Sequence, residues 1–344
     1  MSTVVLLVRP PGKGWGPILS MGRLVAELLE AELIEVDQSS LTVPERVAER
    51  LPRRRGDDVL LVVSPVPEHL RLAVRVPGLR RRFRTVVGWV IDCWWTQRIP
   101  ASVRAGGHYD RLLVTSKEVV GEWESITGLP VGWMPLGTDA LGAWRQRGPA
   151  RDLERPVDLQ RMGRQPEAWG EDEANAARCE ARGLVYGGRP PFGGTPEESY
   201  RNVLDADAGA KTLLAFSNLV SGASYTHPTR EYVTNRWLDA LAVGTVVVGR
   251  RTHEEGSDEL LWDGATVELS PTDAEAGTDA LAEYLRGWSA ATAARVQAEA
   301  LGRLDWRLRA HDVARLLGVS SPTLDAELEA LRLVVEEARA LAGD

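Results

Sequence analysis

Short apolar runs alternate with amphipathic stretches along the first part of the chain. Residues 3–9 form a run of strand length that is rich in valine and leucine, a glycine-rich loop follows, and residues 18–31 carry apolar side chains at helical spacing. Because strands that alternate with helices build parallel sheets, this pattern predicts an α/β domain with helices on both faces of its sheet. The other strand candidates are residues 33–36, 59–63, 86–91, 112–115 and 131–136.

The same pattern begins again after a polar, arginine-rich segment. Residues 140–156 contain the breaker Gly148-Pro149 and are typical of a linker. The chain of 344 residues also exceeds the roughly 250–300 residues at which a single core stops growing. We therefore predict two α/β domains, at residues 1–150 and 151–318, with a final helix at 323–344 that can pack back on the first. The second half has strand candidates at 157–162, 184–186, 212–216, 245–248 and 266–269, its clearest helix at 232–242, and helical stretches at 279–317 and 323–341.

Composition narrows the class of protein. With 44% apolar and 26% charged residues the chain is of ordinary globular composition, and it lacks the run of about 18 apolar residues that a membrane span needs. A net charge of −8 argues against general nucleic-acid binding. The N-terminal residues lack the features of a signal peptide, which predicts a cytoplasmic protein, and the composition is compatible with a homodimer.

Although the net charge of the chain is negative, two segments are rich in arginine, at residues 53–55 and 71–84. They fit two interpretations, which are solvated arginines on a helix and its loop, or a docking patch for an anionic acceptor or a membrane surface.

No metal site is predicted. Cys93 and Cys179 are too few for a disulfide framework or a zinc site, and the five histidines are scattered along the chain. Asp205-Ala-Asp207 spells the DxD motif of metal-binding transferases, but it lies in a polar stretch and not at the end of a strand.

Two segments of the first half are candidates for binding. The loop Gly12-Lys13-Gly14-Trp15-Gly16 lies between a strand and a helix, so the backbone at Gly14 and Gly16 can approach a ligand, although a plain tight turn explains the glycines as well. Asp92 ends an apolar strand and is followed by Trp94 and Trp95. It could hold an acceptor hydroxyl while the indoles stack on a sugar, or these residues could be a helix cap and core tryptophans.

The second half carries a more specific pattern. Glu231 and Asp239 are eight positions apart, and Ala240-Leu-Ala-Val-Gly244 then leads into a valine-rich strand. This segment resembles retaining glycosyltransferases of the GT-B fold, which have a Glu, seven residues, Glu motif before a similar strand. Further matches follow the family's order: Pro135-Leu-Gly-Thr-Asp139, Asp158-Leu-Gln-Arg-Met-Gly163-Arg164, Glu259-Leu-Leu-Trp-Asp-Gly264 and the tryptophan-containing segment 304–310. The resemblance covers about residues 110–310 and is closer to bacterial proteins related to spore-coat maturation than to the best-known sugar transferases.

The resemblance implies a fold and a set of roles. The fold is α/β of the GT-B type, with two facing Rossmann-like domains, an N-terminal acceptor domain and a C-terminal donor domain, and the nucleotide-sugar site in the cleft. Asp239 would bind the ribose hydroxyls, Glu231 would lie by the donor sugar and phosphates, and Arg164 would meet the diphosphate. Two positions depart from the family, since Asp239 replaces a Glu and the lysine that usually follows Gly-Arg is missing. Lys211 or Arg161 could supply the second cation, and Arg236 lies within the motif itself.

The resulting hypothesis is a glycosyltransferase of the hexosyltransferase type. It would transfer a sugar from a nucleoside-diphosphate sugar to a small-molecule or glycan acceptor, with retention of configuration, without a metal and without a cofactor. The catalytic candidates are Glu231, Arg164 and Asp92, and the donor-binding candidates are Asp239, Arg164, Lys211, Gly14, Gly16 and Arg236. Two alternatives remain, which are a nucleotide-sugar epimerase or hydrolase of the same architecture and a non-catalytic protein with a degenerate nucleotide-sugar site.

Overall fold

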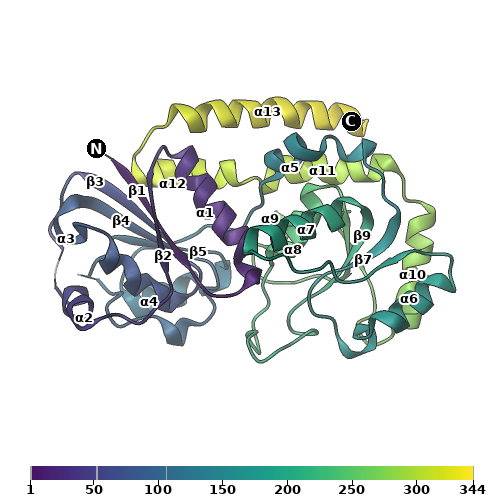
Figure 1. Ribbon diagram of the computed structural model, residues 1–344, viewed down its shortest axis with the longest axis horizontal. Helices are drawn as coiled ribbons and strands as arrows, with labels where there is room; N and C mark the ends of the chain where they lie inside the picture. Colours follow the sequence, from purple (N-terminus) through teal and green to yellow (C-terminus); the bar gives the residue numbers. More distant parts are fainter. Residues whose placement is uncertain (1, 52, 106, 344) are drawn as a thin grey trace. The chain divides into compact units, whose positions relative to one another are not determined.

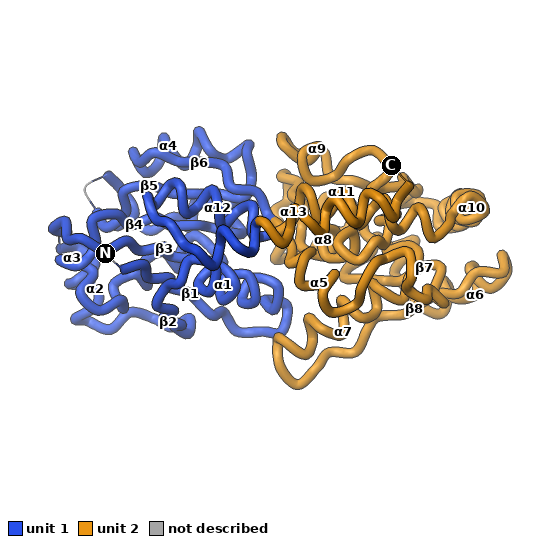
Figure 2. Tube along the Cα trace, turned by 90° about the horizontal axis from the view of Figure 1, so that it is seen from above, with its two compact units in different colours: residues 1–136, 306–328 blue, residues 137–305, 329–344 orange. Residues whose placement is uncertain are grey.

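The computed structural model describes residues 2–51, 53–105 and 107–343. It divides into two compact units. Figure 1 shows the chain coloured along its sequence, and Figure 2 shows the two units in separate colours. Unit 1 contains residues 1–136 and 306–328, and unit 2 contains residues 137–305 and 329–344. The chain therefore passes from one unit to the other three times.

Unit 1 is built on a six-stranded sheet whose strand pairs are all parallel, in the order β2-β1-β3-β4-β5-β6. The central strands are continuous runs of Val and Leu and are almost fully buried, as expected for strands covered on both faces. The strands are β1 (Thr3–Arg9), β2 (Glu32–Asp37), β3 (Asp58–Ser64), β4 (Phe83–Val90), β5 (Arg111–Val114) and β6 (Val131–Trp133).

The helices of unit 1 come from both ends of the chain. Helix α12 packs against α1, and the Trp306 ring of α12 meets the buried Trp89 ring of β4 edge to face at 5.9 Å. After α12, the hydroxyl of Ser321 donates to the carbonyl of Leu28 over 2.6 Å. The helices are α1 (Gly16–Leu28), α2 (Val43–Glu49), α3 (Leu79–Arg82), α4 (Val120–Thr127) and α12 (Trp306–Leu317), with 3₁₀ turns η1 (Lys13–Trp15), η2 (Pro67–Arg75), η3 (Thr96–Arg98) and η4 (Lys117–Val119).

Unit 2 has a five-stranded sheet, again with parallel pairs, in the order β11-β10-β9-β7-β8. The strands are β7 (Val157–Arg161), β8 (Tyr186–Gly187), β9 (Ala210–Phe216), β10 (Val246–Arg250) and β11 (Thr266–Glu268). The helices are α5 (Ala140–Arg147), α6 (Asp172–Glu180), α7 (Pro196–Ala208), α8 (Asn235–Ala242), α9 (Ser257–Leu260), α10 (Ala274–Arg286) and α11 (Ala290–Leu304), with 3₁₀ turns η5 (Ala150–Asp152) and η6 (Glu167–Trp169).

The predicted fold class is confirmed, because each unit is an α/β structure on a parallel, Rossmann-like sheet. The segment 140–156, predicted to be a linker, is instead the helix α5 and the turn η5. It is ordered because Leu141 and Trp144 are buried, and α5 packs against α8 and α11.

The bounds of the compact units differ from those of the predicted domains. Residues 137–150 belong to unit 2, and residues 306–328 belong to unit 1. The last helix, α13 (Pro322–Ala342), begins in unit 1 and continues in unit 2, where Arg151 donates to the carbonyl of Leu341 over 3.1 Å. Compact units are defined by contacts and not by independent folding, so the boundaries at 150 and 318 stay predictions.

Candidate functional site

The carboxyl ends of three strands meet at one edge of the unit 2 sheet. Arg164 follows β7, Glu231 and Arg236 follow β9, and His253 follows β10. Because these strands are parallel and adjacent, the segments after them gather at the same edge. Open α/β sheets bind their ligands at this edge, so these residues form the candidate site of unit 2.

A glycine brings two arginines close together at this edge. Gly163 has a φ of +69°, and a Cβ atom built on it would lie 2.4 Å from Nη1 of Arg236. Only glycine therefore permits the turn after β7 together with this approach of Arg236. Arg236 is fixed by its Nη2, which donates to the carbonyl of Phe216 over 2.7 Å.

Arg164 is held by the loop after β9. Its Nε donates to the carbonyl of Ser221 over 3.1 Å, and its guanidinium lies 4.5 Å from the centre of the Tyr225 ring. Both contacts leave the charge of Arg164 uncompensated, because a carbonyl and an aromatic ring carry no full negative charge.

The electrostatics of this arginine pair favour an anion. Burial lowers the pKa of Arg236 to about 10, and the nearby charge of Arg164 acts in the same direction. Among the described residues, no carboxylate lies within ion-pair distance of Arg164 or Arg236, and Nε of Arg236 is buried without a hydrogen-bond partner. Two neighbouring cations that repel each other are a site where a bound anion relieves both repulsion and desolvation.

Glu231 is held at the same edge of the sheet by two donors. The hydroxyl of Ser217 donates to its Oε1, and the backbone N–H of His253 donates to its Oε2 over 2.8 Å. The loop that carries Glu231 is further tied by Asn218, whose Nδ2 donates to the carbonyl of Arg230 over 2.8 Å. The carboxylate is therefore oriented by backbone and loop contacts at the edge where β9 and β10 end.

Asp239, the second acid of the predicted motif, has a separate set of partners. Its side chain is 1% exposed, and its Oδ1 accepts hydrogen bonds from the hydroxyls of Thr138 at 2.7 Å and Tyr200 at 2.9 Å. Burial raises the pKa of Asp239 to about 7, while the two hydroxyls act in the opposite direction. Glu231 and Asp239 thus have different hydrogen-bond partners. The ribose contact of Asp239 stays a prediction.

Neither of the other predicted cations lies with Arg164. Lys211 is the second residue of β9, at the amino-terminal edge of the sheet, and its Nζ is 2.6 Å from Oδ1 of Asp158. Arg161 is paired with Asp172. Their charges are already compensated within the protein, so Arg236 is the predicted cation that the structure brings to Arg164.

The two acids of the DxD segment differ in exposure, since Asp205 is exposed and paired with Arg147. Asp207 lies at the end of α7 and is fully buried, and neither of its carboxyl oxygens has a hydrogen-bond partner among the described residues. Burial and the nearby Asp239 raise the pKa of Asp207 well above its ordinary value. No group of three His, Cys, Asp or Glu side chains with the geometry of a metal site occurs in the described ranges.

In unit 1, Asp92 lies at the carboxyl edge of the sheet, directly beyond β4. Its backbone N–H donates to the carbonyl of Pro65, which follows β3, over 2.8 Å, and burial raises the pKa of its carboxyl to about 7. Trp94 is buried, whereas Trp95 is half-buried and stacks on the guanidinium of Arg98 at 4.4 Å. Asp92 is therefore a carboxyl group able to exchange a proton near neutral pH.

His69 belongs to the same region and was missed by the sequence reasoning. It lies on η2 after β3, it is 4% exposed, and neither of its ring nitrogens has a hydrogen-bond partner among the described residues. Burial lowers its pKa to about 4, so the ring is neutral at pH 7. A histidine within a helical apolar stretch gives no sequence signal of this kind.

The glycine-rich loop lies between β1 and α1, as predicted. No other described part of the protein comes close to Gly14. Gly14 is exposed on η1, and a Cβ atom there would meet no atom within 4 Å. Gly16 is buried as the first residue of α1. The ligand contact of Gly14 and Gly16 stays a prediction.

None of the described helices is long and apolar enough to cross a membrane. No protein-family model and no curated protein sequence matches the chain.

Several solved structures are similar at low sequence identity. The pneumococcal O-GlcNAc transferase GtfA in complex with UDP and GlcNAc is 11% identical with a TM-score of 0.43, over 80% of this chain and 59% of that chain. A GtfA/B complex is 13% identical with a TM-score of 0.42, over 79% and 58%. The S. aureus MnaA–UDP co-structure is 12% identical with a TM-score of 0.43, over 92% and 97%. The chain thus spans less than two thirds of the length of the first two.

Proposed function

We propose that the protein is a glycosyltransferase whose unit 2 binds a nucleoside-diphosphate sugar. The observation that carries the proposal is the pair Arg164 and Arg236, two adjacent guanidiniums that lack a carboxylate partner among the described residues and lie at the ligand-binding edge of a Rossmann-like sheet. A diphosphate supplies the negative charge that this pair lacks. The sequence resemblance supports the same assignment, because Arg164 and Glu231 fall on its motif positions.

The proposed chemistry follows from the charge that develops during transfer. A departing nucleoside diphosphate gains negative charge, and fixed guanidiniums stabilise that charge without needing to reorganise. Glu231, oriented by Ser217 and the N–H of His253, lies by the donor sugar in this proposal. Transfer without a metal and with retention of the anomeric configuration follows from the resemblance and forms part of the proposal.

Asp239 has the role of a ribose contact in this proposal. Its bonds from Thr138 and Tyr200 both end on Oδ1, which leaves Oδ2 for a ribose hydroxyl. In unit 1, Asp92 is proposed to take the proton of the acceptor hydroxyl, because a base with a pKa near 7 is effective at neutral pH. The acceptor is a small molecule or a glycan.

The test begins with nucleotide binding. Thermal unfolding is measured with UDP, GDP, TDP and ADP, each with and without EDTA, and a ligand at about 100 times its Kd adds about 2.7 kcal/mol to the free energy of unfolding. We expect at least one of the four to raise the Tm, equally in both conditions. A Tm shift that disappears with EDTA would refute the metal-free mechanism.

Variants then assign the binding to the arginine pair. Arg164→Gln and Arg236→Gln should each raise the Kd of the nucleoside diphosphate by about tenfold or more, while the nucleoside is affected much less, because charge-assisted bonds are worth about 1.5–3 kcal/mol. Arg295→Gln, at an exposed arginine on α11, is the control. Equal losses for nucleotide and nucleoside would remove the pair from the phosphate site.

Incubation with the matching sugar nucleotide distinguishes the enzymes. Slow release of free sugar that accelerates with an added acceptor identifies a transferase. Fast release with no response to acceptors identifies a hydrolase, conversion of the bound sugar to its epimer identifies an epimerase, and tight binding with an intact donor identifies a degenerate site.

A further inference from the structure

Helix α2 presents apolar side chains to solvent. Val43 is 73% exposed and Val47, one helical turn later, is 55% exposed, and Leu51 follows the helix at 38% exposed. The helix is nevertheless well defined, because Thr42 and Glu45 form a capping box at its start. None of its residues is fully buried. Its apolar ridge therefore has no partner within the described part of unit 1.

Exposed arginines occur on the same helix and on neighbouring elements. Arg46 and Arg50 lie on α2 and at its end, Arg54 and Arg55 lie in the next loop, and Arg81 lies on α3. The backbone N–H of Arg54 donates to the carbonyl of Arg80 over 2.6 Å, which places this loop against α3. We call these five exposed arginines together with Val43, Val47 and Leu51 the α2–α3 surface. Figures 1 and 2 both show α2 and α3 at the same end of unit 1.

Four acids near the α2–α3 surface are paired with arginines outside it, and one of them, Asp110, is also 4.0 Å from Arg55 of the surface. Glu45 pairs with Arg75 at 3.0 Å, and Glu49 pairs with Arg71 at 2.9 Å. Asp58 is paired with Arg82, and Asp110 with Arg53. Within the described ranges, no carboxylate is within ion-pair distance of Arg46, Arg50, Arg54 or Arg81. The surface is thus locally basic in a chain whose net charge is −8.

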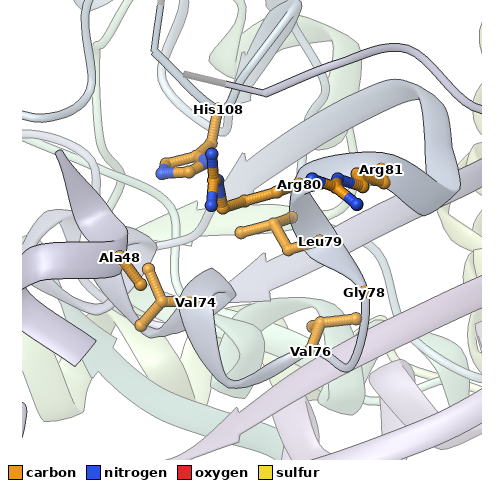
Figure 3. A pocket seen from close by; sticks show the side chains of 8 residues that line it. All are labelled: Ala48, Val74, Val76, Gly78, Leu79, Arg80, Arg81 and His108. Atoms are coloured by element: carbon orange, nitrogen blue, oxygen red, sulfur yellow. The ribbon is translucent and has the colours of Figure 1, made fainter. Parts of the chain in front are cut away.

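A pocket opens beside the same elements. It has a volume of about 260 Å³ and is lined by apolar side chains, among them Ala48 of α2, Val74 of η2 and Leu79 of α3, and by the polar side chains of Arg80, Arg81 and His108. Figure 3 shows the side chain of Arg80 reaching across it toward His108. Since α3 leads into β4 and His108 precedes β5, the pocket lies by the amino-terminal ends of these strands, away from Asp92.

We propose that the α2–α3 surface docks on an anionic lipid bilayer. Protruding apolar side chains enter the boundary between headgroups and acyl chains, and arginines are attracted to anionic headgroups. The rest of the protein carries a net negative charge and is repelled by the same membrane, which favours contact through this basic surface. Nucleic acid would use the arginines but leave the valines in water. The proposal does not depend on nucleotide binding.

Co-sedimentation of the full chain with vesicles tests the proposal. One set is pure phosphatidylcholine, and the other contains one third phosphatidylglycerol. We expect binding to the anionic vesicles at low salt, at least tenfold tighter than to the neutral ones, and a marked weakening at about 0.5 M salt, where the Debye length is only a few ångströms. Equal binding to both sets, or no binding to the anionic vesicles at low salt, would overturn the proposal.

Variants of exposed residues separate the two contributions without touching the core. Arg54→Gln with Arg55→Gln should weaken binding to anionic vesicles by about fivefold per arginine. Val43→Ser with Val47→Ser should weaken it by about tenfold and leave the salt dependence unchanged. The matched controls are Arg145→Gln with Arg286→Gln and Phe192→Ser, all exposed in unit 2, and they should bind like wild type. If the valine variant binds like wild type, or the controls lose as much, the surface is not a membrane contact.

Discussion

Replacing Asp239 by asparagine should change how the stability of the protein depends on pH. The carboxyl is 1% exposed, and burial raises its pKa from the ordinary 3.8 to about 7. Between these two values the unfolded chain has released the proton and the folded chain still holds it. The ionisation of Asp239 therefore lowers the free energy of unfolding of the wild type as the pH rises from about 4 to about 7.

The size of the effect follows from the shift in pKa. Three pH units at about 1.4 kcal/mol each give a loss of roughly 4 kcal/mol from this group across the window. The asparagine side chain of the variant cannot ionise, and its amide oxygen still accepts from Thr138 and Tyr200. We expect the Asp239→Asn variant to be similar to wild type near pH 4 and more stable than wild type near pH 8, by up to that amount.

Urea unfolding followed by tryptophan fluorescence at several pH values measures this difference. A second variant, Thr138→Val, removes a hydrogen bond that lowers the pKa of Asp239, so the fall in stability should extend to higher pH. A difference between Asp239→Asn and wild type that stays constant from pH 4 to pH 8 would show that Asp239 keeps the same protonation in both states, and the reasoning from burial would be refuted.

Three further results are expected. Asp239→Asn should weaken nucleoside diphosphate binding by roughly 1.5–3 kcal/mol, and the 2′-deoxynucleotide should bind wild type and variant almost alike, as calorimetry can show; unchanged binding of both would remove the ribose contact. Lys211→Met should lower the Tm, because Asp158 then loses its cation, but it should leave the Kd of the nucleotide unchanged. A higher Kd for the nucleotide in this variant would place Lys211 in the binding site. Trp306→Ala should cost about 3–5 kcal/mol of unfolding free energy by leaving a cavity against Trp89, and a loss below about 1 kcal/mol would contradict that packing.

The strands of both units were readable from sequence, whereas the polar helices were not. The buried run at 59–63 matches a covered strand, and the structure places β3 there. Helix α7 lacks an apolar stripe, since only Ser199 and Asp207 are buried on it, so periodicity gave no signal. Its start was nevertheless marked, because Thr195 and Glu198 form a capping box around Pro196.

The candidate site was predictable as a set of residues but not as an arrangement. Arg164 and Glu231 were identified by motif, and the strand order brings them to one edge. The pairing of Lys211 with Asp158 depends on the register of β9 against β7, which the sequence does not encode locally. The contact of Arg236 with Gly163 depends on how the loop after β9 folds back, and no spacing rule reports it.

The return of α12 to unit 1 has a consequence for biosynthesis. When the ribosome has made the six strands of unit 1, the face of Trp89 that Trp306 covers is still open, and about half of the chain must follow before α12 emerges. The nascent first unit therefore exposes an aromatic surface while the whole second sheet is being made. A chaperone that shields aromatic surfaces would be needed longest for this part, and the chain can complete its first unit only after its second has been synthesised.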